Sequence, residues 1–219
     1  MKQKHYTRYV MLCLLSVFIV GLIIVVPGCA QEEIQKEAIV EPEIPTHFST
    51  YTDEMALFRI SYPPDWETAL SIIEEAREYT EEVIRNIDED LPVEKVSYLF
   101  FAGLPIETGY MPNVGIAIEP LPLGVNTNDE YVEAGIQVIK SVIQDYRKFT
   151  QIKTTIDGRE ATIIEAEGTF PGLPKTHTLQ MFTIQGKNGW VVSCTSSIGE
   201  FSKWEDDFNA IVRSLRILQ

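Results

Sequence analysis

Residues 175–197, KTHTLQMFTIQGKNGWVVSCTSS, decide the fold of this chain. Two runs rich in β-branched and aromatic residues flank the short segment Lys187-Asn188-Gly189. Such runs predict β-strands, and Asn-Gly between two of them is a strong signal for a tight hairpin turn. This stretch therefore predicts two antiparallel strands joined by a turn at 187–189.

Further strands are predicted upstream by short apolar runs bounded by turn residues. The stretches FTQIKTTID (149–157) and EATIIEAEGTF (160–170) form a pair joined through an Asp-Gly-Arg turn. Earlier strands are expected at about 56–62, 93–103 and 113–120. The run at 93–103 is almost continuously apolar, which indicates burial on both faces.

Three helices are predicted from apolar stripes at helical spacing. The first covers 67–88 and has a Glu-rich outer face. The second follows a capping box that begins at Thr127, and it is expected to run to about Tyr146. The third follows a second capping box, Ser202 with Glu205. Its apolar stripe consists of Trp204, Phe208, Ile211, Val212 and Leu215.

These elements together predict one α+β domain over residues 48–219, an antiparallel-rich sheet with helices packed on it. A domain of about 170 residues buries roughly 70% of its unfolded surface, so its core can stabilise it without cross-links. Cys194 is the one cysteine of this part of the chain, and it therefore has no internal disulfide partner.

The N-terminus has the three parts of a secretory signal peptide. Residues 1–10 are basic, residues 10–26 are apolar, and Gly28 directly precedes Cys29. The Val-Pro-Gly-Cys sequence that ends at Cys29 resembles the lipobox of bacterial lipoproteins. That resemblance implies cleavage before Cys29, which then carries a diacylglycerol. An uncleaved N-terminal helix is the alternative, and the sequence leaves it open.

Both alternatives predict the same location for the rest of the chain. Positive charge before an apolar segment stays in the cytoplasm, so the domain is expected to face outside the cytoplasm at the cell membrane. We divide the chain into a signal peptide or anchor (1–28), an acidic flexible tether (29–47) and the folded domain (48–219). The tether is Glu-rich and contains Pro42 and Pro45.

The net charge excludes some partners. The chain has 18 basic and 32 acidic residues, and the segment 1–28 contains three of the basic ones. The remainder therefore carries 15 − 32, or −17, charges. Such a surface repels phosphate backbones, and no cluster of Lys and Arg offsets it, so we expect no nucleic-acid partner.

Three segments resemble the PsbP-like family, named for an extrinsic protein of photosystem II. They are YTDEMALFRISYPPDW (51–66), the strand GWVVSCTSS (189–197), and the closing helix with Phe208, Ile211 and SLRIL (214–218). The resemblance covers residues 50–219. It implies an antiparallel sheet between helices and a non-enzymatic accessory or binding role. The helix expected at 67–88 departs from the family, which has a shorter connection there.

Few residues of the folded part suggest catalysis or metal binding. His177 has no Cys, His or carboxylate beside it in sequence, so we interpret it as a structural strand residue. Cys194 lies in a strand-like run, where a free cysteine acts as a small hydrophobic residue. Acidic loops at 88–90 and 126–130 keep calcium binding open as an alternative, although neither has the glycine of an EF-hand loop. We expect no catalytic residues, metal site or cofactor.

Two apolar loops are the candidate partner contacts. GYMPN (109–113) contains Tyr110 and Met111, and FPGLP (170–174) contains Phe170 and Leu173. Proline-stiffened loops lose little entropy on binding, and large apolar side chains can be anchors there. The alternative is that these four side chains fold back and cap the core.

The sequence thus leaves three functional hypotheses. The first is a membrane-anchored extracytoplasmic lipoprotein that is a non-enzymatic binding or accessory module for another envelope component. The second is a cation- or small-ligand-binding module that uses the acidic face. The third is a hydrolase with an unrecognised site, which ranks last because no nucleophile–base pair is evident in the sequence.

Overall fold

The structure is a computed structural model, and it describes residues 35–36, 44–53, 55, 58–68, 73, 96–104, 112–171 and 173–218. Within these ranges no helix is both long and apolar enough to cross a bilayer. The apolar run at 10–26 and most of the helix expected at 67–88 lie outside them.

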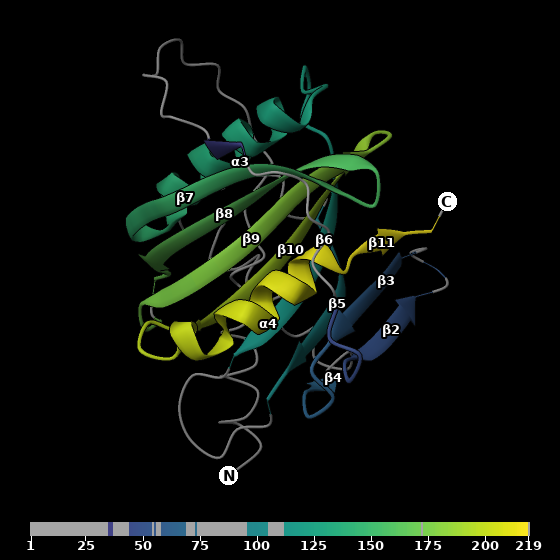
Figure 1. The fold of residues 1–219 in the computed structure, drawn as a ribbon. Helices are drawn as coiled ribbons and strands as arrows, with labels where there is room; N and C mark the ends of the chain where they lie inside the picture. The colour runs from purple at the N-terminus through teal and green to yellow at the C-terminus, as the bar shows by residue number, and fades with distance from the viewer. Residues whose placement is uncertain are drawn as a thin grey trace.

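A large antiparallel sheet forms the centre of the domain, with strand order β1-β7-β8-β9-β10-β6-β5-β4 (Figure 1). Its strands are β1 (Gln35–Lys36), β4 (Glu67–Thr68), β5 (Ser97–Gly103), β6 (Asn113–Pro120), β7 (Gln144–Ile156), β8 (Arg159–Thr169), β9 (Thr176–Gln185) and β10 (Asn188–Ser197). The pairing of β1 with β7 is parallel, and every other pairing is antiparallel. Because Glu67–Thr68 pairs with β5, the expected helix does not begin at residue 67.

A second, small sheet has the order β11-β3-β2. Its strands are β2 (Ser49–Asp53), β3 (Phe58–Tyr62) and β11 (Arg216–Ile217), and both pairings are antiparallel. The N-terminal and C-terminal ends of the described domain therefore meet in one sheet.

The hairpin β9–β10 confirms the strands predicted at 175–197, but its turn is shifted. Gln185 pairs with Asn188, so Gly186 and Lys187 form a two-residue turn. Gly186 has a φ of +62° and Lys187 has no positive φ, which is the pattern of a type II′ turn. Gly189 belongs to the strand instead, where a Cβ atom would lie 2.1 Å from Cζ of Tyr131. This glycine lets helix α3 approach the sheet.

Helix α3 (Asn128–Val142) begins with the predicted capping box, since Thr127 accepts from the backbone N–H of Glu130 and the Glu130 carboxylate accepts in return. The helix ends at Val142 and not near Tyr146. The chain turns away at Asp145, which has a φ of +53°, and β7 already begins at Gln144. Pairing with β8 thus takes precedence over helix propensity in this segment.

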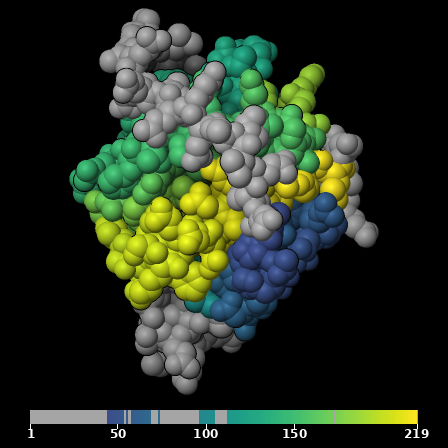
Figure 2. Space-filling model, viewed as in Figure 1, coloured from purple at the N-terminus to yellow at the C-terminus, as the bar shows by residue number. Residues whose placement is uncertain are grey.

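The two helices described in full cover opposite faces of the large sheet (Figure 1). Helix α3 packs on one face through Val132, Ile136 and Ile139. Helix α4 (Phe201–Arg213) and the small sheet lie next to each other over the other face (Figure 2). Successive side chains of a strand point to opposite faces of the sheet, so each strand contributes apolar residues to the core on each face. This arrangement confirms the predicted α+β sandwich.

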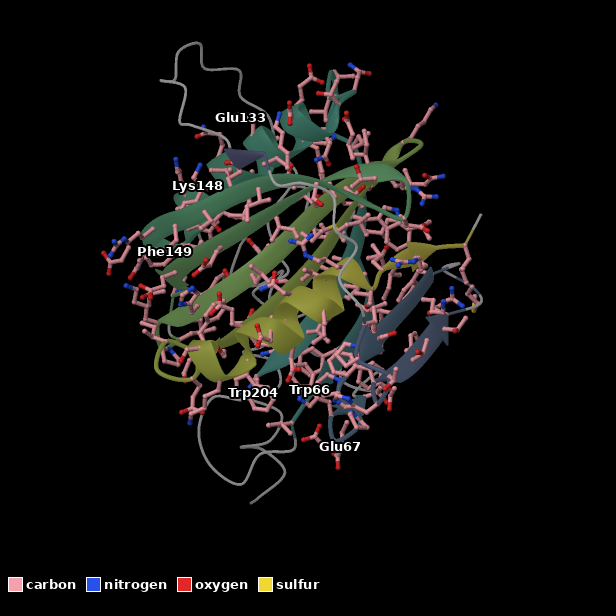
Figure 3. All side chains as sticks on the ribbon, in the orientation of Figure 1. Trp66, Glu67, Glu133, Lys148, Phe149 and Trp204 are labelled. Carbon is pink, nitrogen blue, oxygen red and sulfur yellow. The ribbon has the colours of Figure 1, made fainter. Side chains whose placement is uncertain are left out.

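Helix α4 buries its predicted stripe but lacks the predicted cap. Phe208, Ile211 and Val212 are fully buried, and Trp204 is half-buried against Trp66 with ring centroids 5.9 Å apart (Figure 3). The N-cap residue is Glu200, whose side chain makes no capping bond, and Ser202 already lies within the first turn. The capping box of Ser202 and Glu205 was therefore a wrong prediction.

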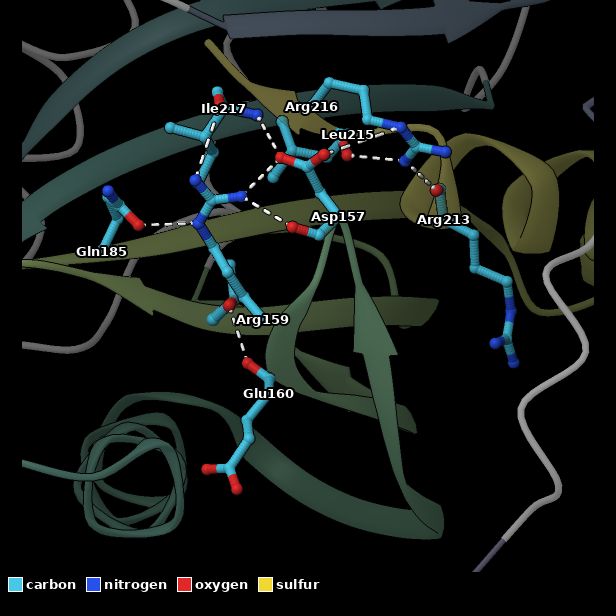
Figure 4. Close-up of polar contacts among 9 residues, drawn as sticks. Asp157, Arg159, Glu160, Gln185, Arg213, Leu215, Arg216 and Ile217 are labelled. Atoms are coloured by element: carbon cyan, nitrogen blue, oxygen red, sulfur yellow. Dashed lines mark hydrogen bonds and ion pairs between the residues drawn. The ribbon is translucent and has the colours of Figure 1, made fainter. Parts of the chain in front are cut away.

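Asp157 at the β7–β8 turn ties the large sheet to the C-terminal strand (Figure 4). Its Oδ2 accepts from the backbone N–H of Ile217 at 3.0 Å and also from the Arg159 guanidinium. Nε of Arg216 lies 3.9 Å from Oδ1. Asp157 and Gly158 both have positive φ, as in a type I′ turn. The turn predicted at this position is confirmed and also anchors β11.

Candidate functional site

His177 lies at the centre of a cluster of polar and aromatic side chains, which we name the histidine cluster: His177, Glu165, Glu167, Phe149 and Phe201. Nε2 of His177 is 2.9 Å from Oε1 of Glu165, and Nδ1 is 3.5 Å from Oε1 of Glu167. The imidazole stacks on Phe201 with centroids 3.6 Å apart and on Phe149 at 5.3 Å. The carboxylates at its two nitrogens and the aromatic rings stacked on it therefore hold the imidazole in one orientation.

The register of three strands and one helix brings the cluster together. Glu167 pairs directly with His177 across β8–β9, and Glu165 lies two residues further along the same face. That face continues the apolar side chains that contact α4, and Phe201 is the first residue of α4. The cluster is thus the polar margin of the core beneath α4.

The outer side of the cluster is exposed and partly basic. Phe149 of β7 is 39% exposed, and the Arg147 guanidinium carbon lies 4.7 Å from its ring centroid. Lys175 pairs with Glu167 at 3.1 Å. Two register irregularities, between Gln144 and Arg147 and between Lys148 and Thr150, interrupt the β7–β8 ladder here. Such bulges at a sheet margin redirect side chains, and Phe149 lies at the outer margin of the sheet (Figure 3).

His177 and Cys194 are the two residues of the folded part that were considered for catalysis in the sequence. Both nitrogens of His177 face carboxylates, those of Glu165 and Glu167. Cys194 is fully buried, and burial raises the pKa of its thiol well above the usual value, which suppresses the reactive thiolate. Among the described residues no group of three or more His, Cys, Asp or Glu side chains could hold a metal ion.

A second buried polar pair lies beneath α3 on the opposite face. The Tyr131 hydroxyl donates to Oε1 of Glu119 at 2.7 Å, and both residues are buried. Burial raises the pKa of Glu119 to about 8, although the bond from Tyr131 lowers it in part. Glu119 is therefore largely protonated at neutral pH. With the carboxyl group enclosed by the core, this pair contributes to stability and not to a surface site.

Two of the five predicted site residues, Phe170 and Leu173, lie within the described part of the chain. Cys29, Tyr110 and Met111 lie outside the described residues. Phe170 is 5% exposed in the core beneath α3, and Leu173 packs against the same core. The loop 170–174 thus caps the core, which is the alternative considered for it, and Phe170 is not an exposed anchor.

Sequence reasoning missed the carboxylates around His177 because it considered only neighbours along the chain. The signal that could have revealed them is the pairing of strands 160–170 and 176–185 about their connecting loop. The two strands are antiparallel, so the pairing runs from Ala161 with Thr183 at one end to Gly168 with Thr176 at the other, and Glu167 pairs with His177. The expected acidic loop at 126–130 is accounted for by helix capping, since Glu130 accepts from the backbone of Asn126 and Thr127.

Comparisons with known proteins define the class of fold. No protein-family model and no curated protein sequence matches this chain significantly. Among solved structures, the chain shares the fold of cyanobacterial PsbP (CyanoP) from Synechocystis sp. PCC 6803, with a TM-score of 0.50 and 12% identity. That match covers 87% of this chain and 98% of CyanoP.

A second solved structure with this fold is LpqN of Mycobacterium tuberculosis, described as involved in cell envelope biogenesis. It aligns with a TM-score of 0.50 and 11% identity over 80% of this chain and 87% of LpqN. Identities this low show a shared fold and nothing more specific. The PsbP-like α+β fold predicted from three segments of the sequence is thereby confirmed.

Proposed function

We propose that this chain is a lipid-anchored extracytoplasmic accessory module that binds another component of the cell envelope and performs no catalysis itself. The observation that carries the proposal is the exposed end of β7, where Arg147 lies over Phe149 on the outer side of the histidine cluster. A cation over an aromatic ring on a fixed framework is a common composition for the centre of a protein interface.

The anchor follows from the N-terminal sequence. The basic segment, the apolar run and the four residues that end at Cys29 support cleavage and attachment of a diacylglycerol. Two acyl chains hold a protein at a membrane more firmly than one myristoyl chain does. The shared fold with LpqN, an envelope biogenesis protein, is compatible with this location.

The contact surface follows from exposure and charge. The chain after residue 28 is strongly acidic, yet the start of β7 carries Arg147 and Lys148 on either side of position 149, next to the cluster. This end therefore suits a partner surface with acidic groups around an apolar recess. Tyr110 and Met111 remain proposed contacts of the same module.

In-cell photo-cross-linking tests this function. A photoreactive amino acid replaces Phe149 in the full chain, and the matched control places it at Leu218, which is also 39% exposed. We expect one recurrent protein adduct from position 149 that is absent from position 218 and weakened by Arg147→Glu. No specific adduct from 149, or the same adducts from both positions, would contradict the proposal. A third probe at Tyr110 examines the loop 109–113 in the same way.

A further inference from the structure

Leu123 is fully exposed on a turn that precedes α3. In this β-turn the backbone N–H of Val125 donates to the carbonyl of Pro122 at 3.1 Å, and Gly124 supplies the positive φ of +88° that a type II turn requires. Nδ2 of Asn126 donates to the carbonyl of Gly124 at 2.9 Å. The turn therefore holds the leucine away from the surface in a fixed conformation.

The residues on either side of this turn are apolar and packed. Val125 is buried in the core beneath α3, and Leu121 packs against the same core. The Leu121 N–H also donates to the carbonyl of Lys187 in the β9–β10 turn at 2.8 Å. Residues 120–128 contain no charged residue, although 23% of the chain is charged. The core thus uses the neighbours of Leu123 and not Leu123 itself, and no ion has to be desolvated if this loop leaves water.

Two other exposed apolar side chains belong to the small sheet. Met55, which is 96% exposed, lies between β2 and β3, and Leu218, which is 39% exposed, directly follows β11. Ile217 of β11 pairs with Phe58, the first residue of β3. Met55 and Leu218 therefore lie at the same end of the small sheet.

Hydrogen bonds place that end of the small sheet beside the loop that carries the exposed leucine. The Ile217 N–H donates to Asp157 in the β7–β8 turn, and Nε of Arg159 donates to Oε1 of Gln185 at the end of β9, 2.6 Å away. The β9–β10 turn follows directly, and Lys187 in it binds the loop before α3. These turns and β11 lie on one side of the domain (Figure 1). We name the three exposed side chains on this side the turn end: Met55, Leu123 and Leu218.

A bilayer suits the turn end better than a protein partner does. Two of its side chains are 96% and 100% exposed and touch almost no neighbour, so they do not form the continuous patch of a protein interface. A fluid bilayer accepts side chains that project separately. Lys187 and Arg59 are exposed nearby and can keep their charges among head groups while their stems contact apolar chains. Because Asp53 and Glu160 lie at this end too, the contact is apolar and does not require anionic lipid.

We propose that the turn end contacts the bilayer that holds Cys29, with Leu123, Met55 and Leu218 entering the layer between head groups and acyl chains. This inference rests on the proposed lipid anchor. Fifteen residues separate Cys29 from Ile44, so the connection spans at most about 50 Å and lets any surface of the domain reach the bilayer. A tethered domain has a high effective concentration at the lipid, so a few apolar contacts are enough to orient it.

This orientation puts the histidine cluster at the far end of the sheet. His177 lies eight residues before Gln185, the last residue of β9, which corresponds to about 26 Å along the strand. The contact surface at Phe149 then faces away from the bilayer. The partner of the module is accordingly a component whose own contact surface lies in the aqueous part of the envelope.

Fluorescence quenching by lipid tests this orientation. The full-length chain, processed in a lipoprotein-producing bacterium, is reconstituted into phosphatidylcholine vesicles that contain nitroxide-labelled lipid. Leu123→Cys carries an environment-sensitive fluorophore, and the control is Ile198→Cys, which is 42% exposed just after the opposite end of β10. Cys194 is fully buried, so the native chain is labelled at the introduced cysteine, and the mass of the product verifies this.

We expect the nitroxide lipid to quench the fluorophore at position 123 at least threefold more than at position 198. In a labelled Met55→Cys variant, adding Leu123→Asp should lower the quenching at least twofold, whereas adding Ile198→Asp should leave it unchanged. Equal quenching at 123 and 198, or stronger quenching at 198, would overturn the proposed orientation, and so would an unaffected signal after Leu123→Asp. The mass of the same sample reports the diacylglycerol on Cys29, so failure of the lipid anchor is distinguishable from failure of the membrane contact.

Discussion

Replacing Glu119 with Gln should change how the stability of the domain depends on pH. Gln has the shape of a protonated Glu, keeps an oxygen that accepts from Tyr131, and cannot ionise. In the folded chain the pKa of Glu119 is raised from 4.5 to about 8, chiefly by burial. The folded state thus favours the neutral carboxyl group.

The direction and the size of the change in stability with pH follow from this raised pKa. A carboxyl whose folded pKa exceeds its unfolded pKa contributes its full stability below pH 4.5 and loses it as the pH rises toward 8. Each pKa unit corresponds to about 1.4 kcal/mol. Relative to E119Q, the wild-type free energy of unfolding should therefore fall by about 3 kcal/mol between pH 4.5 and 7, and by about 5 kcal/mol in total.

Urea denaturation followed by tryptophan fluorescence, at half-unit steps from pH 4.5 to 8.5, measures the difference between the two proteins. Other carboxyl groups titrate in both, so their contributions cancel. The control is Glu130→Gln at the exposed cap of α3, where backbone N–H groups of Asn126 and Thr127 lower the pKa of Glu130. Its stability difference should stay nearly constant across this range, because a carboxyl group with a lowered pKa loses its contribution only as the pH falls below 4.5. Parallel curves for wild type and E119Q across this range would refute the burial argument.

Three other predictions concern packing, the sheet junction and the buried thiol. Gly189→Ala places a Cβ atom 2.1 Å from the Tyr131 ring, and it should lower the free energy of unfolding measured in urea by about 1–3 kcal/mol. The control is Gly199→Ala, which should be nearly neutral because no atom lies within 4 Å of the added Cβ atom. Equal losses of stability in the two variants would contradict the close approach of α3 to the sheet. Asp157→Asn keeps a residue that tolerates positive φ but weakens the hydrogen bonds to Arg159 and Ile217. The free energy of unfolding should drop by about 1–2 kcal/mol, and the Ile217 amide hydrogen should exchange faster with solvent. An unchanged exchange rate would argue against the junction between Asp157 and β11. Cys194 should resist iodoacetamide in the native chain and react fully in urea; rapid native labelling would show that it is not buried.

Local signals predicted the fold well where the sequence itself determines the structure. The capping box at Thr127, the Asp157–Gly158 turn and the stripe of α4 all depend on residues within a few positions of each other, and all three are present. The resemblance of three segments to PsbP-like proteins supplied the architecture that local signals alone left open.

Predictions failed where distant pairing overrides local preference. The helix expected to reach Tyr146 stops at Val142, because the following residues pair with β8. The apparent cap at Ser202 lies inside a helix whose start is set by Phe201 packing on the sheet and on His177. Strand β1 in the tether and the carboxylates around His177 depend on strand register, which the linear sequence does not display.

The mass of the mature chain tests most directly whether it is an externally tethered module. The full-length protein is expressed in a lipoprotein-processing bacterium, extracted from membranes with detergent, and measured intact and after digestion. We predict that residues 1–28 are absent and that the N-terminal Cys29 carries a diacylglycerol. A chain that retains residues 1–28, or that begins at Cys29 with a free thiol, would contradict the lipid anchor.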